Sequence, residues 1–194
     1  MIELRDLQDE DRARLFRWRL QPEVDRWMSD PPPSTTVEHD RWFDDLRLDA
    51  NQAAWIITCD AEPAGLLTLS GLEGRHRRAA WGWYIGEAWA RGRGVGRAAQ
   101  ALGLDLAFLR MNLEKVWAEV LADNAVALRA QAAAGFLREG YMRSHIFKDG
   151  VFRDVVVLAI LAESWMNRRA DVRAGLVRSR LIADQPGLAV HQGY

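Results

Sequence analysis

The densest cluster of residues suited to chemistry is the stretch ARGRGVGR at residues 90–97. Its glycines are Gly92, Gly94 and Gly96, and its arginines are Arg91, Arg93 and Arg97. A strand-like apolar run precedes the stretch and a helix-like apolar run follows it, so its glycines lie at a helix N-terminus. There, backbone N–H groups lack partners inside the helix and the helix dipole adds positive charge. Glycine leaves these donors open and arginine adds charge-assisted hydrogen bonds, so the stretch predicts a pyrophosphate-binding loop.

Two other phosphate-binding loops do not fit the spacing of residues 90–97. Walker A requires Gly-Lys followed by Ser or Thr, and the sequence has no such tripeptide. The dinucleotide fingerprint requires Gly-x-Gly-x-x-Gly after the first strand, whereas this loop follows the fourth expected strand with a different spacing. A formal net charge of −1 also argues against a nucleic-acid partner for the arginines.

Composition and hydrophobic runs restrict the class of protein. With 194 residues, 49% of them hydrophobic and 27% charged, the chain predicts one folded globular domain. The one cysteine, Cys59, cannot form an internal disulfide and suits a reducing cytoplasm. The longest apolar run, at residues 155–162, is too short to span a bilayer, and the charged start has no secretory leader. We therefore expect a cytoplasmic protein with no membrane partner.

The hydrophobic pattern predicts an α+β domain whose strands are joined partly by hairpins and partly by helices, which requires a mixed sheet. Strands are expected at residues 1–7, 53–59, 64–72, 79–86, 115–121, 136–147 and 151–161. Helices are expected at residues 9–20, from Thr35 or Thr36 onward, at 95–111 and at 124–134. The pattern ends near Trp165, so we expect a domain at residues 1–166 and a C-terminal arm or tail at 167–194.

Residues 91–96 match the pattern Arg/Gln-x-x-Gly-x-Gly/Ala, and NAVALRAQAAAGF at 124–136 has an Asn-to-Gly-Phe segment. With the order of the expected elements, these motifs make residues 1–166 resemble the GCN5-related N-acetyltransferases. The resemblance implies a single twisted mixed sheet of about seven strands with helices on both faces. It also implies that the strands at 79–86 and 115–121 splay apart and admit acetyl-CoA between them.

The same resemblance assigns the donor contacts. The pantetheine arm pairs with the backbone of the strand from Trp83 to Ile85, and the pyrophosphate rests on residues 92–97, with Val95 among them. Arg91 belongs to the same motif, and Asn124 occupies a position whose side chain contacts coenzyme A. The implied reaction is direct attack of an amine on the thioester, with no covalent enzyme intermediate and no metal.

Other segments indicate an acceptor. The segments WRLQPEVDRWM, EHDRWFDDL and REGYMRSHIFKDGVFRDVVVLAI resemble the N-acetyltransferases of the pseudaminic acid pathway for flagellin glycosylation. These enzymes acetylate the 4-amino group of a UDP-linked amino-dideoxy sugar, so this nucleotide sugar is the acceptor we expect. Its expected contacts are Arg19, Met28, His39 and Trp42. A homodimer is one assembly that the sequence allows.

Two alternatives remain at this point. Ribosomal-protein N-terminal acetyltransferases, or enzymes for other small amines, resemble the chain more distantly, and Glu23, Asp25 and Asp30 are available for an ammonium group. A non-catalytic acyl-CoA-binding protein is the second alternative.

The second alternative arises because two positions that hold the catalytic acid and base in many relatives carry other residues in this chain. Gln131 stands where many relatives carry a tyrosine that protonates the thiolate, and Ala80 stands where many carry a glutamate base. Tyr84 is expected near the reacting amine, and Tyr141 or a water molecule is expected to protonate the thiolate.

Overall fold

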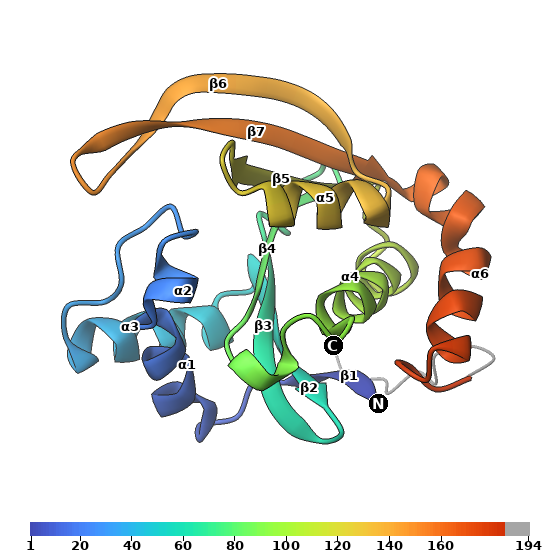
Figure 1. Cartoon of the computed structure of the whole chain (residues 1–194), viewed down its shortest axis with the longest axis horizontal. Helices are drawn as coiled ribbons and strands as arrows, with labels where there is room; N and C mark the ends of the chain where they lie inside the picture. The colour runs from blue at the N-terminus through green and yellow to red at the C-terminus, as the bar shows by residue number, and fades with distance from the viewer. Residues whose placement is uncertain (185–194) are drawn as a thin grey trace.

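A seven-stranded mixed sheet organises the chain, with the strand order β1-β2-β3-β4-β5-β7-β6 (Figure 1). The structure is a computed structural model that describes residues 1–184. The strands are β1 (Ile2–Asp6), β2 (Gln52–Cys59), β3 (Glu62–Ser70), β4 (Arg78–Ile85), β5 (Lys115–Leu121), β6 (Leu137–Lys148) and β7 (Val151–Leu161). All neighbouring pairs are antiparallel except β4 and β5, which are parallel. The predicted mixed sheet is confirmed.

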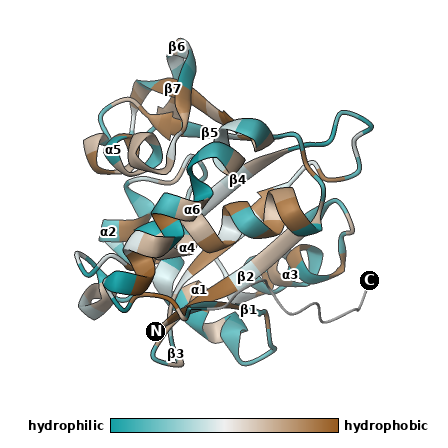
Figure 2. Ribbon diagram, turned by 90° about the vertical axis from the view of Figure 1, so that its right-hand side faces the viewer, coloured by the Kyte–Doolittle hydropathy of each residue, from teal (hydrophilic) through white to brown (hydrophobic). Residues whose placement is uncertain are grey.

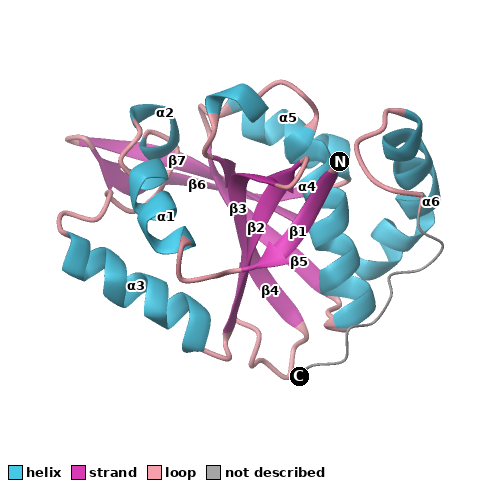
Figure 3. Cartoon of the chain, turned by 90° about the horizontal axis from the view of Figure 1, so that it is seen from below, coloured by secondary structure: helices cyan, strands magenta, loops and turns pink. Residues whose placement is uncertain are grey.

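Helices cover both faces of this sheet, as predicted (Figure 3). They are α1 (Asp11–Arg19), α2 (Pro22–Asp25), α3 (Thr36–Leu48), α4 (Val95–Asp105), α5 (Ala125–Ala134) and α6 (Ala162–Arg178). A 3₁₀ turn at Ala88–Ala90 precedes α4, and a π-helical turn at Leu106–Arg110 follows it. In Figure 2 the helix ribbons alternate between brown and teal, the pattern of helices that pack one face inward.

The two faces of the sheet belong to two hydrophobic clusters because side chains alternate along each strand. Ile57 and Leu67 belong to the larger cluster, which includes α4, α5 and α6. Ile56 and Leu66, their neighbours along the same strands, pack in a smaller cluster with α1 and α3. The acceptor contacts predicted from sequence lie on or near the helices of the smaller cluster, whereas the glycine loop begins α4 on the other side.

The strands β4 and β5 part soon after they begin. Their parallel pairing covers three residue pairs and ends at Ala80 with Trp117. Beyond Ala80, no strand in the described part of the chain pairs with the β5-facing edge of β4, although β3 remains paired on its other edge as far as Ile85. The predicted splay is therefore present and leaves backbone N–H and C=O groups of residues 81–85 without a strand partner on that side.

The C-terminal segment contributes to the core as helix α6. Its Trp165 and Leu176 are fully buried, and Trp165 Nε1 donates to the buried Asp105 carboxylate of α4 at 3.0 Å. Arg169 and Arg173 also pair with Asp105, at 2.6 and 2.8 Å. The division predicted at residue 166 falls inside α6, and residues 185–194 of the predicted tail lie outside the described residues. Within residues 1–184, no helix combines the length and apolarity that a membrane crossing requires.

A glycine-to-alanine change at the end of β4 tests how tightly α1 is seated there. A Cβ at Gly86 would lie 2.2 Å from Cδ2 of the fully buried Trp18 of α1, so Gly86→Ala must displace the indole. We expect the free energy of unfolding to fall by about 1–3 kcal/mol, as overpacking in a core typically does. Urea titration measures it.

Gly74→Ala is the matched control, because its Cβ would approach no described atom closer than 3.8 Å. Equal stability of the two variants would contradict the close packing of Trp18 on Gly86.

Candidate active site

The loop between β4 and α4 presents a row of free backbone donors. Among the described residues, no hydrogen-bond acceptor contacts the backbone N–H groups of residues 92–97. The first helical bond of α4 is Ala98 N–H to Gly94 O, at 3.0 Å. Six consecutive N–H groups at the N-terminus of an eleven-residue helix form a concave anion-binding surface. This geometry fits the pyrophosphate of coenzyme A.

The three glycines of this loop serve different purposes. Gly92 and Gly94 adopt left-handed backbone conformations, with φ of +73° and +80°, which turn the chain into α4. Gly96 is inside the helix, where an added Cβ would lie 2.8 Å from the ring of Trp83. The sequence analysis interpreted Gly96 as room for the ligand. In the structure its missing side chain makes room for an indole of β4, which fixes α4 against that strand.

Arg91 is part of the framework of the site. Its Nε donates to Ile85 O at 3.1 Å, and one Nη donates to Gly86 O at 3.0 Å and to the side chain of Gln21 at 3.1 Å. The guanidinium therefore connects the last residues of β4 to the segment before α2. Arg93 on the loop and Arg97 in the first turn of α4 are exposed, so their side chains are accessible to an anion.

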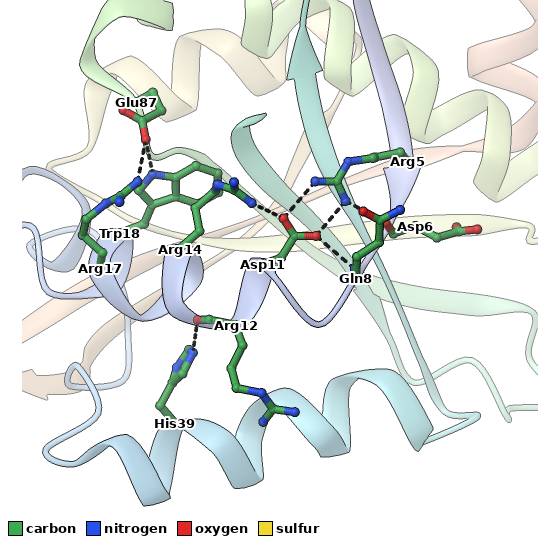
Figure 4. Close-up of polar contacts among 10 residues, drawn as sticks. All are labelled: Arg5, Asp6, Gln8, Asp11, Arg12, Arg14, Arg17, Trp18, His39 and Glu87. Atoms are coloured by element: carbon green, nitrogen blue, oxygen red, sulfur yellow. Dashed lines mark hydrogen bonds and ion pairs between the residues drawn. The ribbon is translucent and has the colours of Figure 1, made fainter. Parts of the chain in front are cut away.

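Helix α1 holds the end of β4 from the other side. The indole of Trp18 lies against Gly86, and its Nε1 donates to the Glu87 carboxylate at 2.8 Å. Figure 4 shows Arg17 reaching the same carboxylate, at 3.2 Å. Together with Arg91, these contacts fix the position where β4 ends and the donor loop begins.

Two buried polar atoms without partners lie beside the parted strands. Trp81 of β4 stacks on Phe136 with ring centroids 5.1 Å apart, and the Phe136 N–H donates to the backbone carbonyl of Gln131. Trp81 Nε1 and Gln131 Oε1 are both buried, and neither has a hydrogen-bond partner among the described residues. A ligand with amide groups can satisfy such a donor and acceptor, and the pantetheine arm of coenzyme A carries two amides.

Asn124 caps helix α5 close to these groups in sequence. Its Oδ1 accepts from the Ala127 N–H at 3.1 Å, which satisfies one of the free donors at the start of the helix. The predicted contact with coenzyme A would therefore come from a residue that also fixes the start of α5.

On the acceptor face of the sheet, the structure brings Tyr84 and Arg19 together. Tyr84 packs in the smaller cluster, with its ring centroid 6.2 Å from that of Trp18, and its hydroxyl oxygen is buried without a partner among the described residues. Burial raises the pKa of Tyr84, and the nearby Arg19 charge opposes that rise. Tyr84 is therefore protonated at neutral pH, and its hydroxyl has a proton to donate to a ligand. Arg19 is held by the backbone carbonyls of Asp30 and Pro31, at 3.0 and 3.1 Å.

The other three predicted acceptor contacts are more scattered. His39 is buried, and its Nε2 lies 2.7 Å from the Arg12 carbonyl of α1, which makes Nε2–H the donor (Figure 4). Burial lowers the pKa of His39, so the imidazole is neutral and joins α3 to α1. The Trp42 ring lies tilted against that of His39, with centroids 5.3 Å apart, and Trp42 is 37% exposed. Met28 is half-buried after α2.

Tyr141 lies away from this group. It is on the edge strand β6, and β7 and β5 separate it from β4. Its hydroxyl donates to the Asp154 carboxylate at 2.5 Å, and this hydrogen bond raises the pKa of Tyr141. The proton of this hydroxyl is therefore committed to Asp154, and the structure does not bring Tyr141 to Tyr84.

An open cleft that the sequence analysis did not identify adjoins Ala80. Its volume is about 620 Å³, and it reaches the point where β4 and β5 part. Its lining includes His76, Arg78, Trp117 and Glu139, which come from three separate segments of the chain. Because these residues have no common sequence motif, only the folded sheet reveals that they share a cleft.

Strands β4 and β5 part, and free N–H groups and unpartnered polar atoms lie beside the opening. A site of this kind suits a phosphate-bearing acyl donor held across a split sheet. Comparison with known proteins identifies the family. Residues 2–137 match the acetyltransferase (GNAT) domain, and the chain belongs to this family. It is an acetyl-CoA-dependent N-acetyltransferase.

Three relatives illustrate the similarity. The Escherichia coli K12 spermidine N(1)-acetyltransferase is 27% identical over 165 residues, which are 85% of this chain and 88% of that protein. Mycobacterium smegmatis RimJ, solved with CoA-disulfide, is 26% identical with a TM-score of 0.81 and covers 91% of this chain and 90% of its own. The Vibrio cholerae spermidine N-acetyltransferase, solved with CoA and spermine, has a TM-score of 0.80 at 22% identity, with coverages of 86% and 98%.

The glycine loop yields a prediction for donor binding. Gly92→Ala places a Cβ at φ +73°, which costs about 1–2 kcal/mol in the left-handed region, and the loop can relieve this strain by turning its N–H groups away. We expect the Kd for coenzyme A to rise about tenfold in isothermal titration.

Gly71→Ala is the control, since Gly71 has φ +77° and, like Gly92, no described atom within 4 Å of an added Cβ. It carries the same strain outside the donor loop. An equal loss of coenzyme A affinity in both variants would show that the loop conformation is not what binds the donor.

Proposed function

We propose that the acceptor is a small amine with more than one positive charge, of the di- or polyamine class, and that this chain acetylates one of its primary amino groups. The observation that carries the proposal is the match to the E. coli spermidine N(1)-acetyltransferase, which extends over 85% of this chain and 88% of that protein. A match over 165 residues extends far beyond the six-residue donor motif.

The charge of the segment between α1 and the start of α3 supports the same class. Residues 21–40, which include α2 and the start of α3, carry five carboxylates against one arginine. The carboxylates are Glu23, Asp25, Asp30, Glu38 and Asp40, and the arginine is Arg26. A segment with this excess of negative charge attracts a polycation and repels a nucleoside diphosphate.

The nucleotide-sugar acceptor expected from sequence has less support. The relatives described above are two spermidine acetyltransferases and RimJ, and the nucleotide-sugar reading depended on Arg19, Met28, His39 and Trp42. Of these, His39 is buried between helices, and one Nη of Arg19 donates to two backbone carbonyls.

The residues of the chain would contribute mainly by binding and orientation. We place the pyrophosphate on residues 92–97 and the thioester beside the unpaired edge of β4, where a backbone N–H can stabilise the oxyanion. Tyr84 would contribute a fixed hydroxyl donor near the reacting amine. The attacking nitrogen must be neutral, so a water molecule at the open cleft beside Ala80 would accept its proton. As the new C–N bond forms, the C–S bond breaks, and a water molecule would protonate the departing thiolate of coenzyme A.

An amine panel tests the proposal. Release of free thiol from acetyl-CoA is measured with spermidine, with an N-terminal ribosomal peptide and with a UDP-4-amino sugar, and mass spectrometry identifies the acetylated product. We expect kcat/KM for spermidine to exceed that for the other two by at least about a hundredfold, which corresponds to roughly 2.7 kcal/mol in the transition state.

Preference for the peptide would assign the chain to protein N-terminal acetylation. Preference for the UDP-sugar would restore the expectation from sequence. Coenzyme A binding with no turnover on any amine would leave a donor-binding protein.

A further inference from the structure

The tip of the β6–β7 hairpin carries an unusual buried lysine. Of the 26 lysine and arginine residues in the chain, only Lys115 and Lys148 are lysines. Lys148 is 7% exposed although it lies at the end of a hairpin whose neighbours Phe147 and Phe152 are more than 60% exposed. In Figure 1 the hairpin extends over α2, and the Lys148 ammonium pairs with the Asp25 carboxylate there. A compact ammonium therefore occupies a site on the acidic α2 segment.

The pair is loose. Lys148 Nζ lies 3.4 Å from both carboxylate oxygens of Asp25, whereas charge-assisted hydrogen bonds of this type are typically about 2.7–2.9 Å long. Within residues 1–184, Lys148 Nζ has no other hydrogen-bond partner. A buried ammonium with one long ion pair gains little in exchange for its lost hydration, so another cation can compete for Asp25.

The pairing of β6 with β7 is also interrupted by a bulge, at which the hairpin can bend. The β6–β7 register shifts between Met142 and Ile146, and Ser144 between them has φ +50°. Asp154 on the opposite strand fills this bulge by bonding the Ser144 N–H at 2.7 Å. Three residue pairs beyond the bulge, from Ile146 with Arg153 to the tip, form a separate outer segment that carries Lys148.

The site under Lys148 is close to the end of β4. The Asp25 N–H donates to the Gln21 carbonyl at 2.8 Å, so Asp25 lies one helical turn beyond Gln21. The Gln21 side chain contacts Arg91, which holds the carbonyls of Ile85 and Gly86. Because β7 lies beside β5, a hairpin that reaches α2 crosses the side on which β4 and β5 part, near the last residues of β4 (Figure 1).

We propose that Asp25 binds the second ammonium group of the acceptor and that Lys148 occupies this position in the free enzyme. The inference rests on the proposed polyamine function and adds the residue that selects for a second charge. The lysine side chain places a primary ammonium on four methylene groups, the same chemistry as the aminobutyl arm of spermidine. The acceptor displaces Lys148 from Asp25, and the outer hairpin segment moves away from α2.

Steady-state kinetics measures how strongly the enzyme prefers an acceptor with a second positive charge. Lys148→Met removes the competing ammonium and keeps an unbranched side chain, so we expect KM for spermidine to fall about tenfold with kcat unchanged. Asp25→Asn should raise KM for spermidine about tenfold. With n-butylamine, which has the same reacting end and no second charge, neither variant should change KM.

Two controls match the charge changes elsewhere on the surface. Arg47→Met removes a cation paired with Asp9, and Asp44→Asn removes a carboxylate paired with Arg12. Neither should alter the spermidine to n-butylamine ratio of KM. Equal effects of the test and control variants, or equal effects on the two amines, would overturn the role of Asp25 and Lys148.

A binding measurement that needs no turnover completes the test. With ¹³C-lysine labelling, the two lysines give two sets of side-chain signals, and Lys148→Met assigns them. Adding spermidine in the presence of coenzyme A should shift the Lys148 signals saturably and leave those of Lys115 in place. Acetylation of spermidine with unmoved Lys148 signals would contradict this inference alone. Failure to acetylate spermidine would instead contradict the proposed function, and this inference with it.

Discussion

The parting of β4 from β5 after Ala80 is the constraint on which the rest of this enzyme depends. Two parallel strands that separate leave backbone groups without partners, and a folded protein tolerates this only where a ligand or water satisfies them. The donor loop is the direct continuation of the parted strand, so its six free N–H groups lie in a fixed relation to the opening. Trp18 against Gly86, and Arg91 on the carbonyls of Ile85 and Gly86, hold that relation from both sides.

The donor and acceptor halves of the site differ in how they are built. The donor half comes from one continuous segment, from β4 through the loop into α4, and it uses mostly backbone groups. The acceptor half combines α1, α2 and α3 with a hairpin more than a hundred residues later, and Lys148 with Asp25 joins them. Under the proposed function, side chains and charge would carry its selectivity, whereas backbone groups would hold the donor.

This difference explains how much the sequence alone predicts. The glycine loop and the order of strands and helices along the chain were predictable, because they leave local signatures in glycine spacing and hydrophobic period, and the splay was expected from the family resemblance alone. The hydrogen bonds of Arg91 to carbonyls, the burial of His39 and the pairing of Tyr141 with Asp154 were not, since each depends on a partner distant in sequence. Residues from 167 onward were expected as a C-terminal arm or tail, because the anchor of α6, the buried Asp105, lies on another helix.

The central claim is that the free N–H groups of residues 92–97 bind the donor pyrophosphate. Amide hydrogen exchange, followed residue by residue by NMR with and without coenzyme A, tests it most directly. We expect these six amides to exchange rapidly in the free protein and to become at least about tenfold protected in the complex, since each gains an acceptor. Unchanged exchange at residues 92–97 in a protein saturated with coenzyme A would contradict it.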